Sequence, residues 1–350
     1  MAYTVSQADP VDSGPFVVDL WKHNLPTASA GRFPWLYAGD RAKAWLLHTE
    51  DSSVVGAVGL MSRAIQSPQG MLQAGQAIDL NVDLNHRTVG PALSLTRTVV
   101  QSAKQQAYKF VYSLPNAESE PVLKRVGYRF LGSVQRWYKP IRCEKLLHSR
   151  LHNPLLQKAA SVASIAVDGA LAVKSRELFY RRPADIHVKL TDGFDAAFDQ
   201  LWKKAAGQFA YIGERTADYL TWRFGRSPDG PFQVFCIKNA CQELLAYLVF
   251  SCRDGITYVN DLLFVDASSL DLLLSEFLRH VRRQRGTAVI VVYLGTSMVS
   301  QSLRRFGFWR RPSAWNAMVY ADWNQLGDEA ASFLDEQQWY LTRADIDTDL

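Results

Sequence analysis

The chain has 350 residues, 48% of them hydrophobic, so it can bury a full core and is expected to form two domains rather than a disordered scaffold. Its 39 Lys and Arg against 34 Asp and Glu give a formal charge of +5, with the basic residues spread along the chain. This balance favours small anionic ligands and argues against nucleic acid. The cysteine spacing fits no zinc site, and no secretory signal is evident, so we expect no metal, no disulfides and a cytoplasmic location.

The first half of the chain is predicted to be α/β. Two strands joined by a polar turn are expected at 44–49 and 54–63. The next strand, 76–84, alternates, with one face formed by Ile78, Leu80, Val82 and Leu84 and the other by Asp79, Asn81 and Asp83. A helix at 90–107, a buried strand at 109–115 and a helix at 119–126 that ends at Gly127 complete the series.

The stretch "NHRTVGPAL", residues 85–93, falls between the alternating strand and the following helix. Pro91 suits a first helical turn, where a missing N–H costs nothing. Free backbone N–H groups and the helix dipole favour an anion such as phosphate there, Gly90 lets a ligand approach the main chain, and Arg87 adds charge. The alternative is an ordinary strand-to-helix turn with a solvated His86.

The two halves of the chain echo each other. Residues 32–47 resemble 219–235, each with a Trp-x-aromatic pattern, and "LKRVGYRF" resembles "LRRFGFWR". "QAIDLNVDL" also matches "TYVNDLLFVD", which places Asp79 opposite Asp261. The order and spacing agree, so two copies of one domain is the economical interpretation.

The first half resembles the GNAT superfamily of acyl-CoA-dependent N-acyltransferases. Arg87, Gly90 and Ala92 match the family's Arg/Gln-x-x-Gly-x-Gly/Ala pattern, and Asn116 lies eleven residues before the Gly127-Tyr128 pair, as the family often has it. The doubling looks most similar to tandem members encoded near exopolysaccharide genes. The resemblance implies two tandem GNAT-like domains, each a mixed twisted sheet flanked by helices. We divide the chain into an acyl-CoA-binding domain (1–141), a helical connector (142–189), a degenerate second domain (190–325) and an acidic C-terminal tail (326–350).

The resemblance implies acetyl-CoA, or another acyl-CoA, as cosubstrate and a small-molecule amine as acceptor. The turn would hold the pyrophosphate, the pantetheine would lie between two splayed strands, and Asn116 would bond to it, with a plain turn residue as the alternative. The predicted cofactor-binding residues are Val82, Leu84, Arg87, Thr88, Val89, Gly90, Pro91, Ala92 and Asn116.

Catalysis needs a base for the acceptor amine, and Asp79 is our first candidate, with Asp83 the second. The alternative is that Asp79 is a structural carboxylate, as its echo Asp261 suggests. Many family members carry a tyrosine as acid where this chain has Leu123, and Tyr112 and Tyr128 are conceivable substitutes.

The second half is expected to lose the ligand turn. Its counterpart, "DASSLDLLLSEF" from Asp266, has no glycine and carries Asp271 and Glu276, so CoA should not bind there, and 268–271 should cap a helix.

The C-terminal tail from Phe333 is expected to dock on the rest of the protein, with Asp345 among the carboxylates that could attract an amine. Residues 160–173 are too short to span a membrane, which leaves an interfacial helix on anionic lipid or a packing helix.

Three functions follow from these features. The first is an N-acetyltransferase acting on a small amine, such as an amino sugar of a surface polysaccharide precursor. The second is a Fem-type aminoacyl transferase, which would lack the pyrophosphate turn. The third is a non-catalytic acyl-CoA sensor. The sequence leaves the oligomeric state open.

Overall fold

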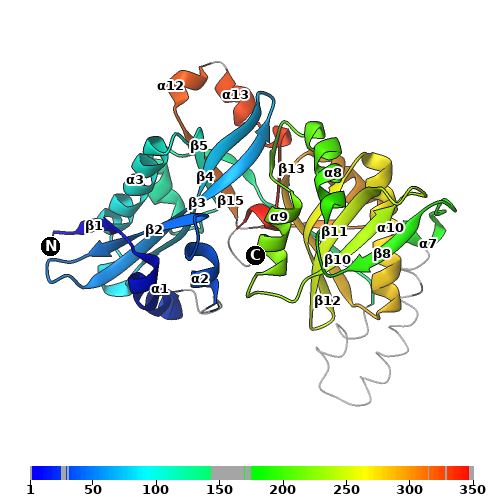
Figure 1. Cartoon of the computed structure of the whole chain (residues 1–350), viewed down its shortest axis with the longest axis horizontal. Coiled ribbons are helices and arrows are strands. Elements are labelled where there is room, and N and C mark those ends of the chain that lie inside the picture. The colour runs from blue at the N-terminus through cyan, green and yellow to red at the C-terminus, as the bar shows by residue number, and fades with distance from the viewer. Residues whose placement is uncertain are drawn as a thin grey trace, which may run out of the picture.

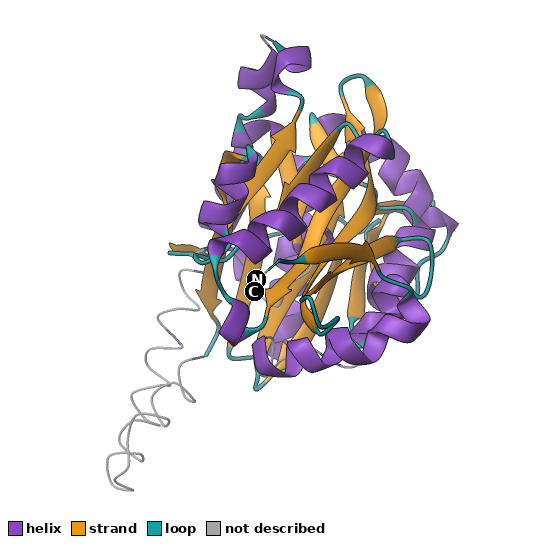
Figure 2. Ribbon diagram, turned by 90° about the vertical axis from the view of Figure 1, so that its left-hand side faces the viewer, coloured by secondary structure: helices purple, strands orange, loops and turns teal. Residues whose placement is uncertain are grey.

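The computed structural model describes residues 2–24, 29, 31–142, 169, 175–313, 315–327 and 329–346. Within them, sixteen strands form one continuous mixed sheet with helices on both sides (Figures 1 and 2). This architecture confirms the predicted α/β class.

The elements of the first half alternate much as the sequence predicts. They are β1 (Thr4–Gln7), α1 (Pro10–Asn24), α2 (Arg32–Tyr37), β2 (Ala42–His48), β3 (Val54–Ser67), β4 (Gly70–Val82), η1 (Leu84–His86), α3 (Val89–Gln105), β5 (Phe110–Ser113), α4 (Glu120–Val126), β6 (Arg129–Ser133) and β7 (Gln135–Pro140). Helix α4 ends as expected, because Gly127 adopts a left-handed φ of 106°.

The second half repeats this order. Its elements are α7 (Arg176–Phe179), β8 (His187–Thr191), α8 (Ala196–Ala205), η2 (Ala206–Gln208), β9 (Tyr211–Gly213), α9 (Ala217–Leu220), η3 (Thr221–Gly225), β10 (Gln233–Lys238), β11 (Leu244–Arg253), β12 (Ile256–Phe264), α10 (Ala267–Arg283), β13 (Ala288–Gly295), α11 (Ser297–Arg305), β14 (Trp309–Arg311), β15 (Asn316–Ala321), α12 (Trp323–Leu326), α13 (Glu329–Phe333), η4 (Glu336–Gln338), β16 (Trp339–Thr342) and η5 (Arg343–Asp345).

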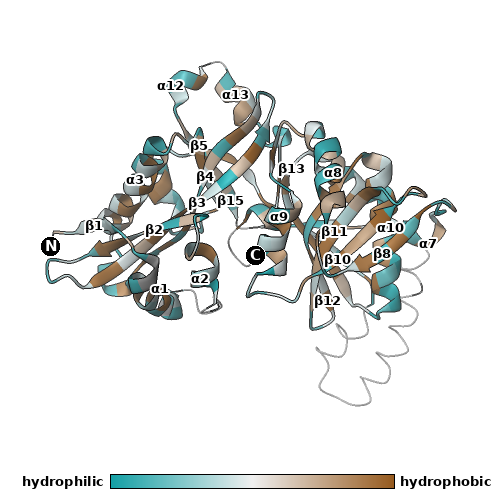
Figure 3. Cartoon of the chain, in the orientation of Figure 1, coloured by the Kyte–Doolittle hydropathy of each residue, from teal (hydrophilic) through white to brown (hydrophobic). Residues whose placement is uncertain are grey.

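Each half forms one lobe of the sheet. The first lobe comprises β1–β6 with α1–α4, and the second comprises β8 and β10–β14 with α8–α11, side by side in Figure 1. In the first lobe α3 packs on the face that carries Leu47 and Val58, whereas α1 and α2 pack on the face that carries Leu46 and Ala57. Figure 3 shows the strands of both lobes as largely hydrophobic, because both faces are covered.

The two lobes exchange strands. β7 leaves the first lobe and lies between β13 and β14 of the second, antiparallel to both. In return, β15 lies between β5 and β6 of the first lobe. The division of the chain at 141/142, 189/190 and 325/326 stays a prediction, and the exchange means that neither 1–141 nor 190–325 contains all the strands of its own lobe.

The C-terminal strand β16 joins the two lobes. It pairs antiparallel with β13 and parallel with β9, and β9 pairs with β3. Trp339, Tyr340 and Leu341 are fully buried. The prediction that the tail docks is therefore confirmed for 333–346. The suggested role of Asp345 in attracting an amine is wrong, because its buried carboxylate pairs with Arg63 and Arg215.

Candidate functional site

The turn between β4 and α3 leaves backbone donors uncapped. Thr88 is the N-cap of α3, and its side chain makes no capping hydrogen bond. Val89, Gly90 and Pro91 form the first helical turn, where N–H groups have no partner within the helix. A Cβ added at Gly90 would meet nothing within 4 Å, so this face of the turn is open. The arrangement can receive an anion.

Polar side chains from three elements surround this turn. The Nη2 of Arg87 donates to the Oδ1 of Asn24 at 2.6 Å, and the Nδ2 of Asn24 donates to the Oδ1 of Asn81 at 2.6 Å. The Nη1 of Arg87 also lies 3.4 Å from the Oε2 of Glu118, at the start of the α4 segment. These contacts hold the end of α1 against β4. Both partners of the Arg87–Glu118 pair are exposed to solvent, so the pair is weak and easily displaced.

A groove of about 600 Å³ lies beside the turn. Six of the predicted cofactor-binding residues line it: Val82, Arg87, Thr88, Val89, Ala92 and Asn116. The other three do not: Leu84 is exposed in η1, Pro91 is buried in the first turn of α3, and Gly90 lies at the open turn. Asn24, Glu118 and Ser119 also line the groove, although none of the three was predicted to bind the cofactor.

Strands β4 and β5 splay apart at the inner end of this groove. They pair in parallel only at Gly75 with Val111 and Gln76 with Tyr112. A smaller cavity of about 100 Å³ fills the opening, and it shares Leu80, Asn116 and Ser119 with the groove. The two cavities therefore form one path from the uncapped turn into the sheet.

A bulge at Asp79 interrupts β4. Gly59 pairs with Ile78 and Ala57 with Asn81, so β4 has one residue more than β3 here, and Asp79 has a φ of 54°. The predicted alternation is wrong for this reason. Ile78 packs in the core with α1 and α2, whereas Val82 packs in the core with α3. The extra residue reverses which side chains face each way.

The carboxylate of Asp79 is buried and fully engaged. Its Oδ2 accepts a hydrogen bond from the Tyr37 hydroxyl at 2.7 Å, and its Oδ1 lies 3.3 Å from the Nη2 of Arg32. Asp79 lines the smaller cavity, so it lies where the predicted base should be. Its fixed donors also favour the structural alternative. Arg32 and Tyr37 lie in the "RFPWLY" segment. The internal repeat marks this segment, but the sequence pattern assigned neither residue a role.

Asp83, the second predicted base, lies outside both cavities. Its Oδ1 accepts from the backbone N of Asn85 at 2.9 Å and caps η1.

The tyrosines predicted as acids are also remote from both cavities. The hydroxyl of Tyr112 donates to Gln76, burial raises the pKa of Tyr112 and of Tyr128, and neither tyrosine lines the path. Leu123 does line the smaller cavity.

Asn116 lines both cavities, as a pantetheine-binding residue should. Its Oδ1 already accepts from the backbone N atoms of Glu118 and Ser119, at 3.2 and 2.9 Å, and thereby fixes the turn before α4. A ligand would therefore meet its amide Nδ2 rather than its oxygen.

The second lobe differs from the first at the N-terminus of its long helix and at the splay between its two parallel strands. Asp266, rather than the predicted 268–271, is the N-cap of α10, and its Oδ1 accepts from the backbone N of Ser269 at 2.8 Å. β12 and β13 also splay after Val259 and Val291, but β16 pairs with β13 from Tyr293 onward, and Thr342 on it donates to Asp261 at 2.6 Å. The chain itself thus fills the opening that stays open in the first lobe.

Among the described residues, no group of three or more His, Cys, Asp or Glu could hold a metal ion. No helix in the described ranges is long and apolar enough to cross a bilayer. The segment 160–173, predicted to lie on lipid or to pack as a helix, falls outside the described residues except for Gly169.

No protein-family model and no curated protein sequence matches the chain. Many solved structures resemble it in fold, among them three whose descriptions name acyltransferases. A GCN5-related N-acetyltransferase from Anabaena variabilis matches at a TM-score of 0.65 and 11% identity, over 91% of this chain and 73% of that one. One from Kribbella flavida matches at 0.60 and 12%, over 91% and 72%. An Enterococcus faecalis protein described as a probable N-acyltransferase matches at 0.64 and 9%, over 92% and 72%. These likenesses confirm the predicted GNAT fold.

Proposed function

We propose that the chain is an N-acyltransferase that takes its acyl group from acyl-CoA bound in the first lobe. The observation that carries this proposal is the path from the uncapped N-terminus of α3 into the splay between β4 and β5. The diphosphate would lie on the N–H groups of Val89 and Gly90, beside Arg87, and the pantetheine would extend along the groove. The fold shared with N-acetyltransferase structures supports the same function.

The smaller cavity supports a short acyl group. At about 100 Å³ and lined mostly by apolar side chains, it suits acetyl better than a long chain, so acetyl-CoA is the proposed cosubstrate. The acceptor nitrogen would attack the thioester carbonyl, the C–N bond would form and the C–S bond would break, with CoA leaving as thiolate. The amine's proton would pass to Asp79, the only predicted base that lines the cavity. A small amine such as an amino sugar of a surface polysaccharide precursor is the proposed acceptor.

A second function, acyl-CoA sensing without catalysis, is favoured by two observations. The Asp79 carboxylate is engaged by Arg32 and Tyr37, and Leu123 occupies the place of the family's tyrosine acid. A Fem-type function is disfavoured, because the pyrophosphate turn is open and uncapped.

An acyl-transfer assay distinguishes these functions. Purified protein with acetyl-CoA and a panel of amino sugars and polyamines should release free CoA thiol and acetylated amine in equal amounts. Tight CoA binding by calorimetry without product from any amine would favour the sensor. Absence of CoA binding would refute both functions.

A further inference from the structure

A second cavity lies in the second lobe, far along the sheet from the first-lobe groove. It has a volume of about 700 Å³ and is bounded by β8, β10, β11, the hairpin between β11 and β12, and the C-terminal half of α10. No element of the first-lobe groove contributes to it, and no function discussed above uses it.

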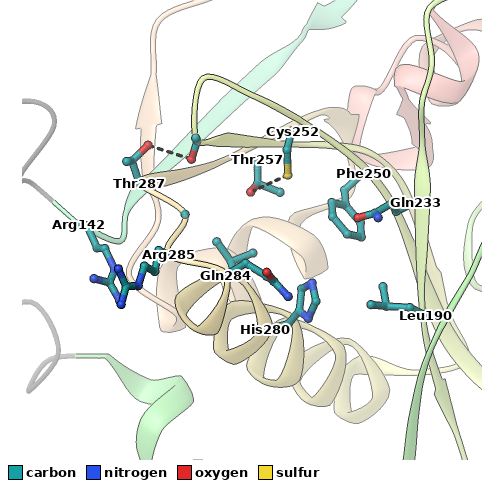
Figure 4. Close-up of a pocket in the computed structure, with 13 residues that line it drawn as sticks. Arg142, Leu190, Gln233, Phe250, Cys252, Thr257, His280, Gln284, Arg285 and Thr287 are labelled. Carbon is teal, nitrogen blue, oxygen red and sulfur yellow. Dashed lines mark hydrogen bonds between the residues drawn. The ribbon is translucent and has the colours of Figure 1, made fainter.

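The two ends of this cavity differ in chemistry. Figure 4 shows the guanidinium groups of Arg142 and Arg285 at one end, and the side chains of Phe250, Leu190 and the polar Gln233 at the other. Leu190 is 44% exposed although it is a large apolar side chain on an edge strand. The cavity therefore offers a cationic end and an apolar end.

Among the described residues, no acidic side chain pairs with this cationic end. None of the residues that line the cavity is Asp or Glu. Within the described part of the chain, the Arg285 side chain makes no ion pair or hydrogen bond, and the Arg142 side chain donates to the carbonyl of Arg282 at 3.3 Å. Two guanidinium groups without a carboxylate between them attract an anion.

The last turn of α10 turns few free carbonyls toward that anion. Arg285 follows the helix at a φ of 57°, and the backbone N of Gly286 donates to the carbonyl of Val281 at 2.9 Å, so carbonyls of the last turn are satisfied. Glycine is preferred at such a left-handed position, yet an arginine occupies it, and its side chain lies beside that of Arg142 at the cationic end (Figure 4). His280, also in the lining, has its pKa lowered by burial and by Arg283, and adds a polar atom without a fixed charge.

We propose that this cavity binds an amphipathic anion: a carboxylate held by Arg142 and Arg285, with an unbranched alkyl chain lying along Phe250 and Leu190. The site is independent of the proposed acyl-CoA groove. Charge complementarity fixes the head group, since a charged carboxylate gains two arginine contacts that a neutral head cannot make. The apolar end fixes the tail, because burying alkyl groups there removes apolar surface from water.

The test uses the full-length protein without CoA and titrates decanoate, 1-decanol and acetate by calorimetry. We expect saturable binding of decanoate, at least tenfold weaker binding of decanol and none of acetate at the same concentrations. Arg285→Gln should weaken decanoate binding by about tenfold, because one charge-assisted contact is lost. Arg283→Gln is the matched control, since it removes the same charge from the same helix end but does not line the cavity.

Two further measurements keep the test decisive. Arg142→Gln should weaken decanoate binding as Arg285→Gln does, and thermal unfolding shows whether each variant is folded. The proposal is overturned if decanoate does not bind, if decanol binds equally well, or if Arg283→Gln has the effect of Arg285→Gln. If the protein sediments with anionic vesicles but does not bind decanoate, the cavity contacts a membrane surface instead, which also overturns the proposal.

Discussion

The indole rings of Trp35 and Trp222 stack with their centroids 4.8 Å apart and their planes at 13°. Each ring also donates its Nε1 to the other residue's main-chain oxygen, at 3.0 and 3.4 Å. Contacts that are the same in both directions are those of a two-fold axis, here within one chain. The two tryptophans that the repeat aligns thus lie against each other at the junction of the lobes.

This pair should couple the stabilities of the two lobes. Trp35→Ala and Trp222→Ala should each lower the free energy of unfolding, and the double variant should lose about 1 kcal/mol less than the sum of the two, because stacked aromatic pairs have that coupling. Urea unfolding of the four proteins measures it. Trp309→Ala, on the exposed edge strand β14, is the control that should add independently. Strict additivity of Trp35→Ala and Trp222→Ala would contradict the coupling.

CoA should bind only to the first lobe, at the start of α3. Gly90→Glu places a carboxylate where the diphosphate is expected, and we predict at least a hundredfold loss of CoA affinity, since like charges at about 4 Å repel by several kcal/mol near a protein surface. Ser268→Glu is the matched control, because Ser268 is the exposed second residue of α10 as Gly90 is of α3. Calorimetry should show unchanged binding for it. Equal losses in both variants would refute the assignment.

Local patterns in the sequence predicted the elements well, and the site in part. The helix at 90–107, its Pro91 and the glycine after α4 follow from residues close in sequence, and the structure has them. The uncapped turn was predicted for the same reason. The partners of Asp79 were not, because Arg32 and Tyr37 are joined to it only by the tertiary fold.

Three features could not be read from local pattern. The bulge at Asp79 adds one residue to a strand whose sequence alternates as if it were regular. β7 and β15 have the apolar pattern that they would have in either lobe, so the sequence does not show that they are exchanged. β16 fills the splay between β12 and β13 by backbone pairing. Many apolar sequences can make such pairing, so the sequence of β16 does not reveal its place.

The ion pairs under β16 should make the fold sensitive to acid. Burial alone would raise the pKa of Asp345, but the charges of Arg215 and Arg63 outweigh it and hold this pKa below the usual 3.8. Because the folded-state pKa is depressed, the stabilisation is present above pH 3.8 and is lost as pH falls through the lower folded value. Chemical denaturation from pH 7 down to about pH 2 should show this loss begin below pH 3.8 and grow as the pH falls further.

Asp345→Asn should reduce the pH dependence below pH 3.8 and destabilise the protein at pH 7 by about 3 kcal/mol, because Arg63 and part of Arg215 lose their buried counter-charge. Asp335→Asn, an exposed cap of η4, is the control and should cost under about 1 kcal/mol. A stability curve of Asp345→Asn that parallels the unmodified protein down to about pH 2 would contradict the prediction.

The base can be tested with Asp79→Asn. If Asp79 accepts the amine's proton, turnover should fall about a hundredfold, CoA affinity should stay the same, and the residual rate should rise at high pH as more amine is neutral. The variant should also be less stable by about 3 kcal/mol, because Arg32 loses a buried partner. Tyr37→Phe separates the effects, since it removes one hydrogen bond from Asp79 but keeps the carboxylate.

Steady-state rates, measured well below each variant's unfolding temperature, decide between the two roles. Loss of turnover in Asp79→Asn with near-normal turnover in Tyr37→Phe would identify a base. Equal, small losses that follow stability in both would identify a structural carboxylate that only fixes the bulge. Asp83→Asn should change little, because Asp83 caps η1 and lines neither cavity. A large loss there with normal turnover in Asp79→Asn would assign the base to Asp83, and no loss in either would mean that the acceptor arrives already neutral.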